Sequence, residues 1–222
     1  MAVTEITVRG EAYDRRLPDR ATVNLMVQRE GRDWADVHAT VAQAVARVRD
    51  LVDRLIAEHA GAVEHHAISQ AYQRSWRTKV STMYAEHVDI AVTFTDFGVM
   101  NGWVAAVATE TVKVSHIDWR LSREAQDAVR RELGERAVAD ARARADSFAA
   151  AAGVTIIGLA ALADPGLLGG DQGAIPAPRA MMMSRGVAFA GGSADAVTDP
   201  GYDLTPNYME TTAQVEARYL AE

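Results

Sequence analysis

The chain has 222 residues, of which 49% are apolar and 24% charged, values typical of a soluble globular protein with a substantial core. Its net charge of −7 argues against nucleic acid or an anionic membrane as the main partner, because both are bound by basic surfaces. The chain contains no cysteine, which excludes disulfides, thiolate catalysis and cysteine-bound metals.

Alternating apolar and polar residues predict strands, and apolar residues spaced by three and four predict helices. In the first half of the chain these patterns predict strands 5–13 and 21–28, a helix from Asp33 to about His59, strands 63–75 and 83–94, and a short helix 97–109. The short link between the first two strands favours an antiparallel pair.

The second half of the chain begins with a strand at 111–121 and continues into a helix capped by Ser122 and ended by Gly153. Strands follow at 154–163 and 208–220. The predicted fold is α+β: a mainly antiparallel sheet, two long helices packed on one face, and the order ββαββαβαββ. We expect a single domain over residues 1–222.

The packing stripe of the helix between Ser122 and Gly153 is mostly alanine. Its predicted members are Val129, Leu133, Ala137, Ala141, Ala145, Phe148 and Ala152. Small side chains let the helix lie close on a sheet or on another helix, and Ala137, Ala141 and Ala145 are candidate interface residues. Acids four residues before arginines predict ion pairs on the other faces: Asp127 with Arg131, Glu132 with Arg136, and Asp140 with Arg144.

Residues 165–206 are rich in glycine and methionine. Their apolar residues follow neither the alternation of a strand nor the three- and four-residue spacing of a helix, so the segment is predicted to be a long loop or interaction arm. Met181, Met182 and Met183 can be soft copper ligands, an adaptable apolar surface that packs on a neighbouring subunit, or part of a disordered segment. Phe189 lies in the same segment and is a candidate interface residue.

Three histidines cluster near a predicted helix-to-strand turn. His59, His65 and His66 lie beside acidic residues, and imidazole with carboxylate suits zinc or nickel. However, His65 and His66 are adjacent on a predicted strand and point to opposite faces. They are weak metal candidates, and a solvated cluster is the alternative.

Other polar pairs, His87 with Asp89 and His116 with Asp118, fit local hydrogen bonds better than catalysis, because no nucleophile or phosphate-binding motif accompanies them. We therefore expect no enzyme activity and no cofactor.

The amino terminus has no basic segment followed by an apolar one, and no apolar run is long enough to span a membrane. A cytoplasmic location is expected for this sequence, and a periplasmic or secreted one if a signal segment has been removed from it.

Three segments resemble the SIMPL-domain family, which includes the bacterial periplasmic immunogenic proteins. They are ITVRGEA with DRATVNLMVQREG, then ERAVADARARADSFAAAAGVTIIGLAAL, then TPNYMETTAQVEARYLAE at the end. The resemblance covers essentially the whole chain. It implies an α+β protein without known catalytic residues, whose relatives include ring-like or channel-like oligomers and proteins linked to oxidative stress.

Together these observations predict a non-enzymatic, self-assembling homo-oligomer larger than a dimer, and the resemblance implies a stress-related role for it. The alternative is a binding module that holds a small molecule or metal at a subunit interface, and a hydrolase comes third.

Overall fold

The computed structural model describes residues 3–168 and 204–222, and the contacts divide the chain into two compact units. We name each unit after its long helix. The described parts of the α3 unit are residues 3–17, 121–168 and 207–222, and those of the α1 unit are residues 18–120 and 204–206.

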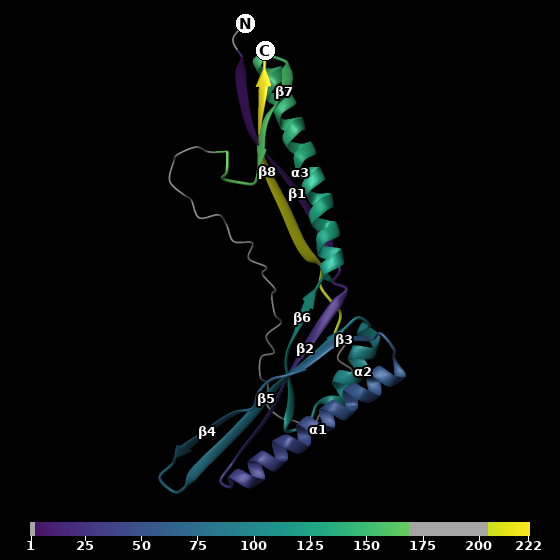
Figure 1. Cartoon of the computed structure of the whole chain (residues 1–222), viewed down its shortest axis with the longest axis vertical. Coiled ribbons are helices and arrows are strands. Elements are labelled where there is room, and N and C mark those ends of the chain that lie inside the picture. The colour runs from purple at the N-terminus through teal and green to yellow at the C-terminus, as the bar shows by residue number, and fades with distance from the viewer. Residues whose placement is uncertain (1–2, 169–203) are drawn as a thin grey trace. The chain divides into compact units, whose positions relative to one another are not determined.

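The α3 unit contains β1 (Thr4–Arg16), α3 (Arg123–Ala152), β7 (Ile156–Ala163) and β8 (Met209–Ala221). Its strands form an antiparallel sheet in the order β1-β8-β7, and α3 runs along one face of it (Figure 1). The predicted caps are confirmed: the Ser122 hydroxyl accepts the N–H of Ala125, and Gly153 ends the helix with a left-handed φ of 72°.

The buried stripe of α3 repeats every four residues and consists of Val129, Leu133, Ala137, Ala141, Ala145 and Ala149. The prediction is wrong for Phe148 and Ala152, which are exposed, because the stripe continues from Ala145 to Ala149. The predicted ion pair between Asp140 and Arg144 is confirmed at 3.1 Å. Asp127 instead contacts Arg130, three residues away.

The α1 unit contains β2 (Arg20–Gly31), α1 (Trp34–Glu58), β3 (Val63–Ile68), β4 (Tyr72–Arg77), β5 (Thr82–Phe94), α2 (Phe97–Val107) and β6 (Val112–Arg120). Its sheet has the order β3-β5-β2-β6, and β4 also pairs with β5 (Figure 1). Asp33 caps α1 by accepting the N–H of Ala35 at 2.8 Å. The core combines the apolar face of β2, valines of α1, and large residues of β5 and α2, such as Phe94 and Met100.

The predicted α+β class with antiparallel pairing is confirmed, but the strands form two sheets, and each long helix packs on its own sheet. The predicted pairing of the first two strands is wrong: β1 pairs with β8, whereas β2 pairs with β5 and β6. The inward face of β1 carries Gly10 and Ala12, which fit an alanine helix, whereas Val23 and Leu25 of β2 fit the valine stripe of α1.

The segment predicted as one strand over 63–75 is two strands, β3 and β4, which share β5 as a partner. Between them, the Ser69 N–H bonds the Asp89 carbonyl oxygen at 2.8 Å. None of the described helices has the length and apolar character needed to cross a membrane.

Candidate functional site

The three candidate interface alanines lie inside the α3 unit. Ala137, Ala141 and Ala145 are fully buried, and α3 packs there on β1 and β8. The approach is so close that a Cβ added at Gly10 of β1 would lie 2.0 Å from the Ala137 carbonyl oxygen. No side-chain surface remains for a second subunit, which corrects the assignment of these alanines as interface residues. The other candidates, Met181, Met182, Met183 and Phe189, lie outside the described residues.

The three candidate metal-binding histidines do not converge. His59 ends α1, and His65 and His66 follow one another on β3, all exposed. The neighbouring carboxylate of Glu64 is engaged by two arginines, Arg20 at 3.1 Å and Arg120 at 3.8 Å. Within residues 3–168 and 204–222, no group of three or more His, Asp or Glu side chains could hold a metal ion.

The predicted histidine–aspartate pairs behave differently from each other. His116 Nε2 lies 3.2 Å from Asp118 Oδ2 on β6, and this carboxylate also accepts from the Asn24 side-chain amide at 2.9 Å. The ring of His87 packs on Tyr72, with centroids 5.0 Å apart. The contacts of Asn24 with Asp118 and of Tyr72 with His87 link neighbouring strands and so contribute to the stability of the sheet.

A buried carboxylate joins α1 to the β4–β5 hairpin. Glu86 is 2% exposed, and its oxygens lie 3.0 and 3.2 Å from Nδ1 of His38 on α1. The side-chain amide of Gln73 on β4 donates to it at 3.2 Å. The ring of Trp34 stacks on His38. A buried charge needs such partners, so this cluster holds the helix, β4 and β5 together.

Carboxylates of the α3 unit also have strong partners. The backbone N–H of Gly166 and the guanidinium of Arg9, 3.0 Å away, hold the pKa of Glu216 below its usual range. A hydrogen bond from Arg16 lowers the pKa of Asp14 in the same way. Arg16 also pairs with Glu132 of α3 and thereby links β1 to the helix.

The edge strand β7 exposes apolar side chains. Ile157, Leu159 and Leu162 are 51%, 52% and 47% exposed. The pairing with β8 shifts register twice, which places Leu159 opposite Tyr219 and Leu162 opposite Ala217, two residues buried in the core of the unit. Because α3 packs chiefly on β1 and β8, it leaves the leucines on the same face of β7 about half exposed among the described residues.

The edge of β7 also lacks charge. Its sequence, IIGLAALA, contains no charged residue and no proline. The opposite edge strand of the sheet, β1, carries charges along its length, including Arg9, paired with Glu216, and Arg15, paired with Glu210. Charged residues are a common protection of sheet edges against pairing with other chains, so β7 is the less protected edge of this sheet.

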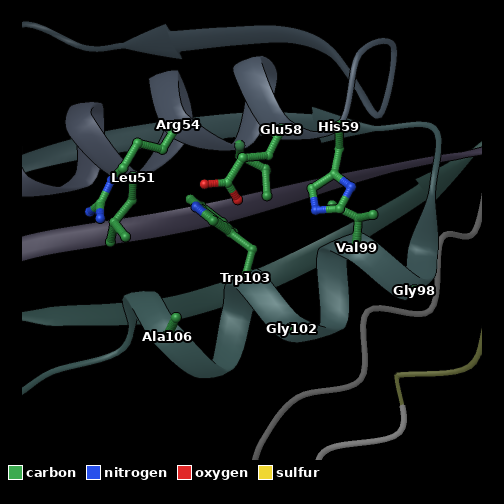
Figure 2. A pocket seen from close by; sticks show the side chains of 10 residues that line it. Leu51, Arg54, Glu58, His59, Gly98, Val99, Gly102, Trp103 and Ala106 are labelled. Atoms are coloured by element: carbon green, nitrogen blue, oxygen red, sulfur yellow. The ribbon is translucent and has the colours of Figure 1, made fainter.

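A groove of about 460 Å3 separates α1 from α2 within the α1 unit. Figure 2 shows the Trp103 indole extending from α2 toward α1, where Glu58 and His59 form the other wall. The apolar lining includes Leu51, Leu55 and Val99, and Gly98, Gly102 and Ala106 give α2 a wall of small residues. The groove thus combines an apolar surface with a few polar groups, which is the usual composition of a small-molecule site.

The family assignment follows from comparison with known proteins. A family model described as SIMPL, protein of unknown function (DUF541), matches residues 6–219, nearly the whole chain. The chain belongs to the SIMPL family. Comparison with curated proteins finds no match.

The SIMPL match includes elements of both units, from β1 to β8. The β7 edge, the Glu86 cluster and the α1–α2 groove therefore all lie within the family domain. Sequence reasoning about this SIMPL chain missed the Glu86 cluster, although a signal was present: Glu86 falls on the same predicted strand face as Val88, Ile90 and Val92. The groove was also missed, because the residue pattern of each helix predicts its apolar face but not that α1 lies beside α2.

Proposed function

We propose that this SIMPL chain is a non-enzymatic protein that assembles with copies of itself, and that the β7 edge is a contact between copies. The observation that carries the proposal is the uncharged edge strand with Ile157, Leu159 and Leu162 about half exposed. A row of unpaired backbone N–H and C=O groups beside such side chains is a template for strand addition.

The contact has a simple symmetric form. Two β7 strands that pair antiparallel across a two-fold axis would join two three-stranded sheets into one. Full burial of a Leu or Ile side chain contributes about 1.5–3 kcal/mol, so completing the burial of a half-exposed one contributes about 1 kcal/mol. Three such residues from each copy, together with the new backbone hydrogen bonds, provide a substantial driving force.

A single two-fold contact produces a dimer. The ring-like or channel-like assembly implied by the family resemblance needs a second contact on another surface, because closed rings form through heterologous contacts. The polar clusters support a structural function, since Glu86 and Asp118 are both engaged by side chains of neighbouring elements.

The test is the mass of the intact chain and of two variants, measured by size-exclusion chromatography with light scattering across the micromolar range. Leu159→Lys places a charge on the β7 edge and should lower the oligomer mass. The control, Thr7→Lys, adds the same charge at an exposed position of β1 and should leave the mass unchanged. Circular dichroism verifies that both variants are folded.

Two results would contradict the proposal. One is an intact chain that stays at its monomer mass of 23.9 kDa at all concentrations. The other is a folded Leu159→Lys variant that assembles as tightly as the intact chain, which would place the contact elsewhere.

A further inference from the structure

The groove between α1 and α2 holds two polar groups without partners. Trp103 is only 4% exposed, and its indole N–H is buried without a hydrogen-bond acceptor in the described part of the chain. Glu58, the last residue of α1, lines the same groove, and no described residue makes a hydrogen bond or ion pair with its carboxylate. Figure 2 shows the nitrogen-bearing end of the Trp103 ring directed at the wall that carries Glu58.

The helix that carries Trp103 is also built to leave space. Gly102 lies in the middle of α2, and a Cβ added there would meet no atom within 4 Å. Glycine in a helix interior destabilises the helix relative to alanine. Neither a close backbone contact nor a positive φ requires glycine at this position. The effect of this glycine is to keep the α2 wall of the groove open beside Trp103.

We propose that this groove binds a small apolar molecule that carries one hydroxyl group. The hydroxyl oxygen accepts the hydrogen bond from the Trp103 N–H, and the hydroxyl hydrogen is donated to the Glu58 carboxylate. A hydroxyl is the simplest group that both accepts and donates. The apolar body lies against Leu51, Leu55 and Val99.

Other ligand classes match the groove less well. A carboxylate can accept from Trp103 but has no hydrogen to donate to Glu58, which repels it; Arg54 in the same lining offsets part of this repulsion. An ammonium can pair with Glu58 but cannot accept from the indole. An ether satisfies Trp103 alone, and a hydrocarbon satisfies neither group. Because the indole N–H is covered from solvent, a side chain of the groove wall must move when the ligand binds. The wall includes the exposed residues Arg54 and Glu58.

The experiment uses the full chain labelled with 15N and titrated with phenol, anisole or toluene. These three probes share a ring but differ in the hydrogen bonds they make. The four tryptophans yield four indole N–H signals, and the variant Trp103→Phe identifies the signal of Trp103. Phenol should shift that signal saturably and bind about threefold to tenfold more tightly than anisole, which is the net effect of one hydrogen bond.

Three variants sharpen the result. Trp103→Phe keeps an aromatic ring and removes the donor to which phenol and anisole both bond. The preference for anisole over toluene should therefore disappear, while the preference for phenol over anisole, which depends on Glu58, should remain. Gly102→Leu fills the groove and should abolish binding while the chain stays folded. Its matched control is Gly134→Leu on α3, another helical glycine whose added Cβ would meet nothing within 4 Å, and this variant should bind phenol normally.

The proposal is overturned if phenol leaves the Trp103 signal unchanged up to its solubility limit. It is also overturned if phenol, anisole and toluene bind with equal affinity, or if Gly102→Leu binds phenol as well as the intact chain. Self-assembly through β7 is measured separately by mass, so the failure of either proposal leaves the other intact.

Discussion

Each unit packs one long helix on an antiparallel sheet, but the side chains at the contact are small in the α3 unit and large in the α1 unit. In the α3 unit the helix contacts its sheet through alanines, and Gly10 of β1 lies beneath Ala137 and Ala141. In the α1 unit the helix contacts its sheet through valines, and the core contains large residues such as Phe94, Leu25 and Met100.

The difference sets what each unit tolerates. Small residues bring the backbone of α3 close to β1, so an added atom there meets backbone atoms, which cannot move aside independently. Large residues hold α1 farther from its sheet, so stability there depends on filling volume. Substitutions that enlarge a buried side chain should therefore destabilise the α3 unit most. Substitutions that shorten a buried side chain should destabilise the α1 unit most.

The chain provides a separate signal for each unit. All four tryptophans, Trp34, Trp76, Trp103 and Trp119, lie in the α1 unit. Tryptophan fluorescence therefore follows the unfolding of the α1 unit, whereas far-ultraviolet circular dichroism follows the helices of both.

Gly10→Ala should produce the largest effect. The added methyl carbon would lie 2.0 Å from the Ala137 carbonyl oxygen and 2.6 Å from the Ala141 backbone nitrogen. Overpacking against fixed atoms destabilises by about 3 kcal/mol or more. In urea unfolding, the part of the circular dichroism signal that comes from α3 should be lost at lower urea, while the fluorescence transition stays in place.

The matched control is Gly134→Ala, where nothing lies within 4 Å of the added carbon. It should stabilise α3 by about 0.5–1 kcal/mol. If Gly10→Ala moves both transitions equally, the two units unfold as one, and the comparison between them fails as a description of stability.

Ala141→Leu should destabilise the α3 unit by about 1–3 kcal/mol, because the fully buried alanine has no room for a longer side chain. The reciprocal change in the α1 unit is Ile90→Val, which removes one buried methylene and should destabilise by about 0.5–1.5 kcal/mol. Circular dichroism should show both changes, whereas fluorescence should show only the second, because all four tryptophans lie in the α1 unit. An unchanged midpoint for Ala141→Leu would show that α3 can shift outward, against the close packing described here.

His38→Ala tests the polar contact of the α1 unit. The buried carboxylate of Glu86 would keep Gln73 alone as a partner. Because His38 is half exposed, water can replace part of the lost bond, and we expect a loss of about 1 kcal/mol in the fluorescence transition. The loss should vanish in the background of Glu86→Leu. An equal loss in both backgrounds would assign the effect to the stacking of Trp34 on His38.

Much of this architecture could be predicted from the sequence because it is local. The period of the valines predicted α1, and Ser122 and Gly153 predicted the ends of α3. The strand partners could not be predicted in the same way. The choice of β8 over β2 as the partner of β1 depends on matching Gly10 and Ala12 to a helix more than a hundred residues away in the chain.

For the candidate sites too, the sequence predicted the local pattern but not the tertiary contacts. The alanine seam was recognised, but its role was misassigned, because periodicity shows that a face is apolar without showing what covers it. In the sequence, nothing distinguishes the leucines of β7 from the buried apolar residues of an ordinary strand. Their exposure depends on two register shifts and on where α3 lies, both of which arise from tertiary packing.

Acid should weaken the α3 unit through Glu216, and this is the smallest effect we expect. Its pKa is lowered in the folded chain by the Gly166 N–H and by Arg9, so the ionised form stabilises the fold. That contribution is present above the unfolded pKa of about 4.3 and is lost as the pH falls through the lower folded value. Glu216→Gln should therefore reduce the decline of the circular dichroism midpoint between about pH 6 and pH 3, a range that brackets the usual glutamate pKa.

Part of the decline should remain in this variant, because the lowered pKa of Asp14 acts in the same direction. The control is Glu210→Gln on the same strand, whose side chain is 70% exposed, and it should decline as the intact chain does. If the two variants decline equally, the contact of Glu216 with Gly166 and Arg9 contributes no acid sensitivity. Because these contacts lie in the α3 unit, the fluorescence transition of the α1 unit should have the same pH dependence in both variants.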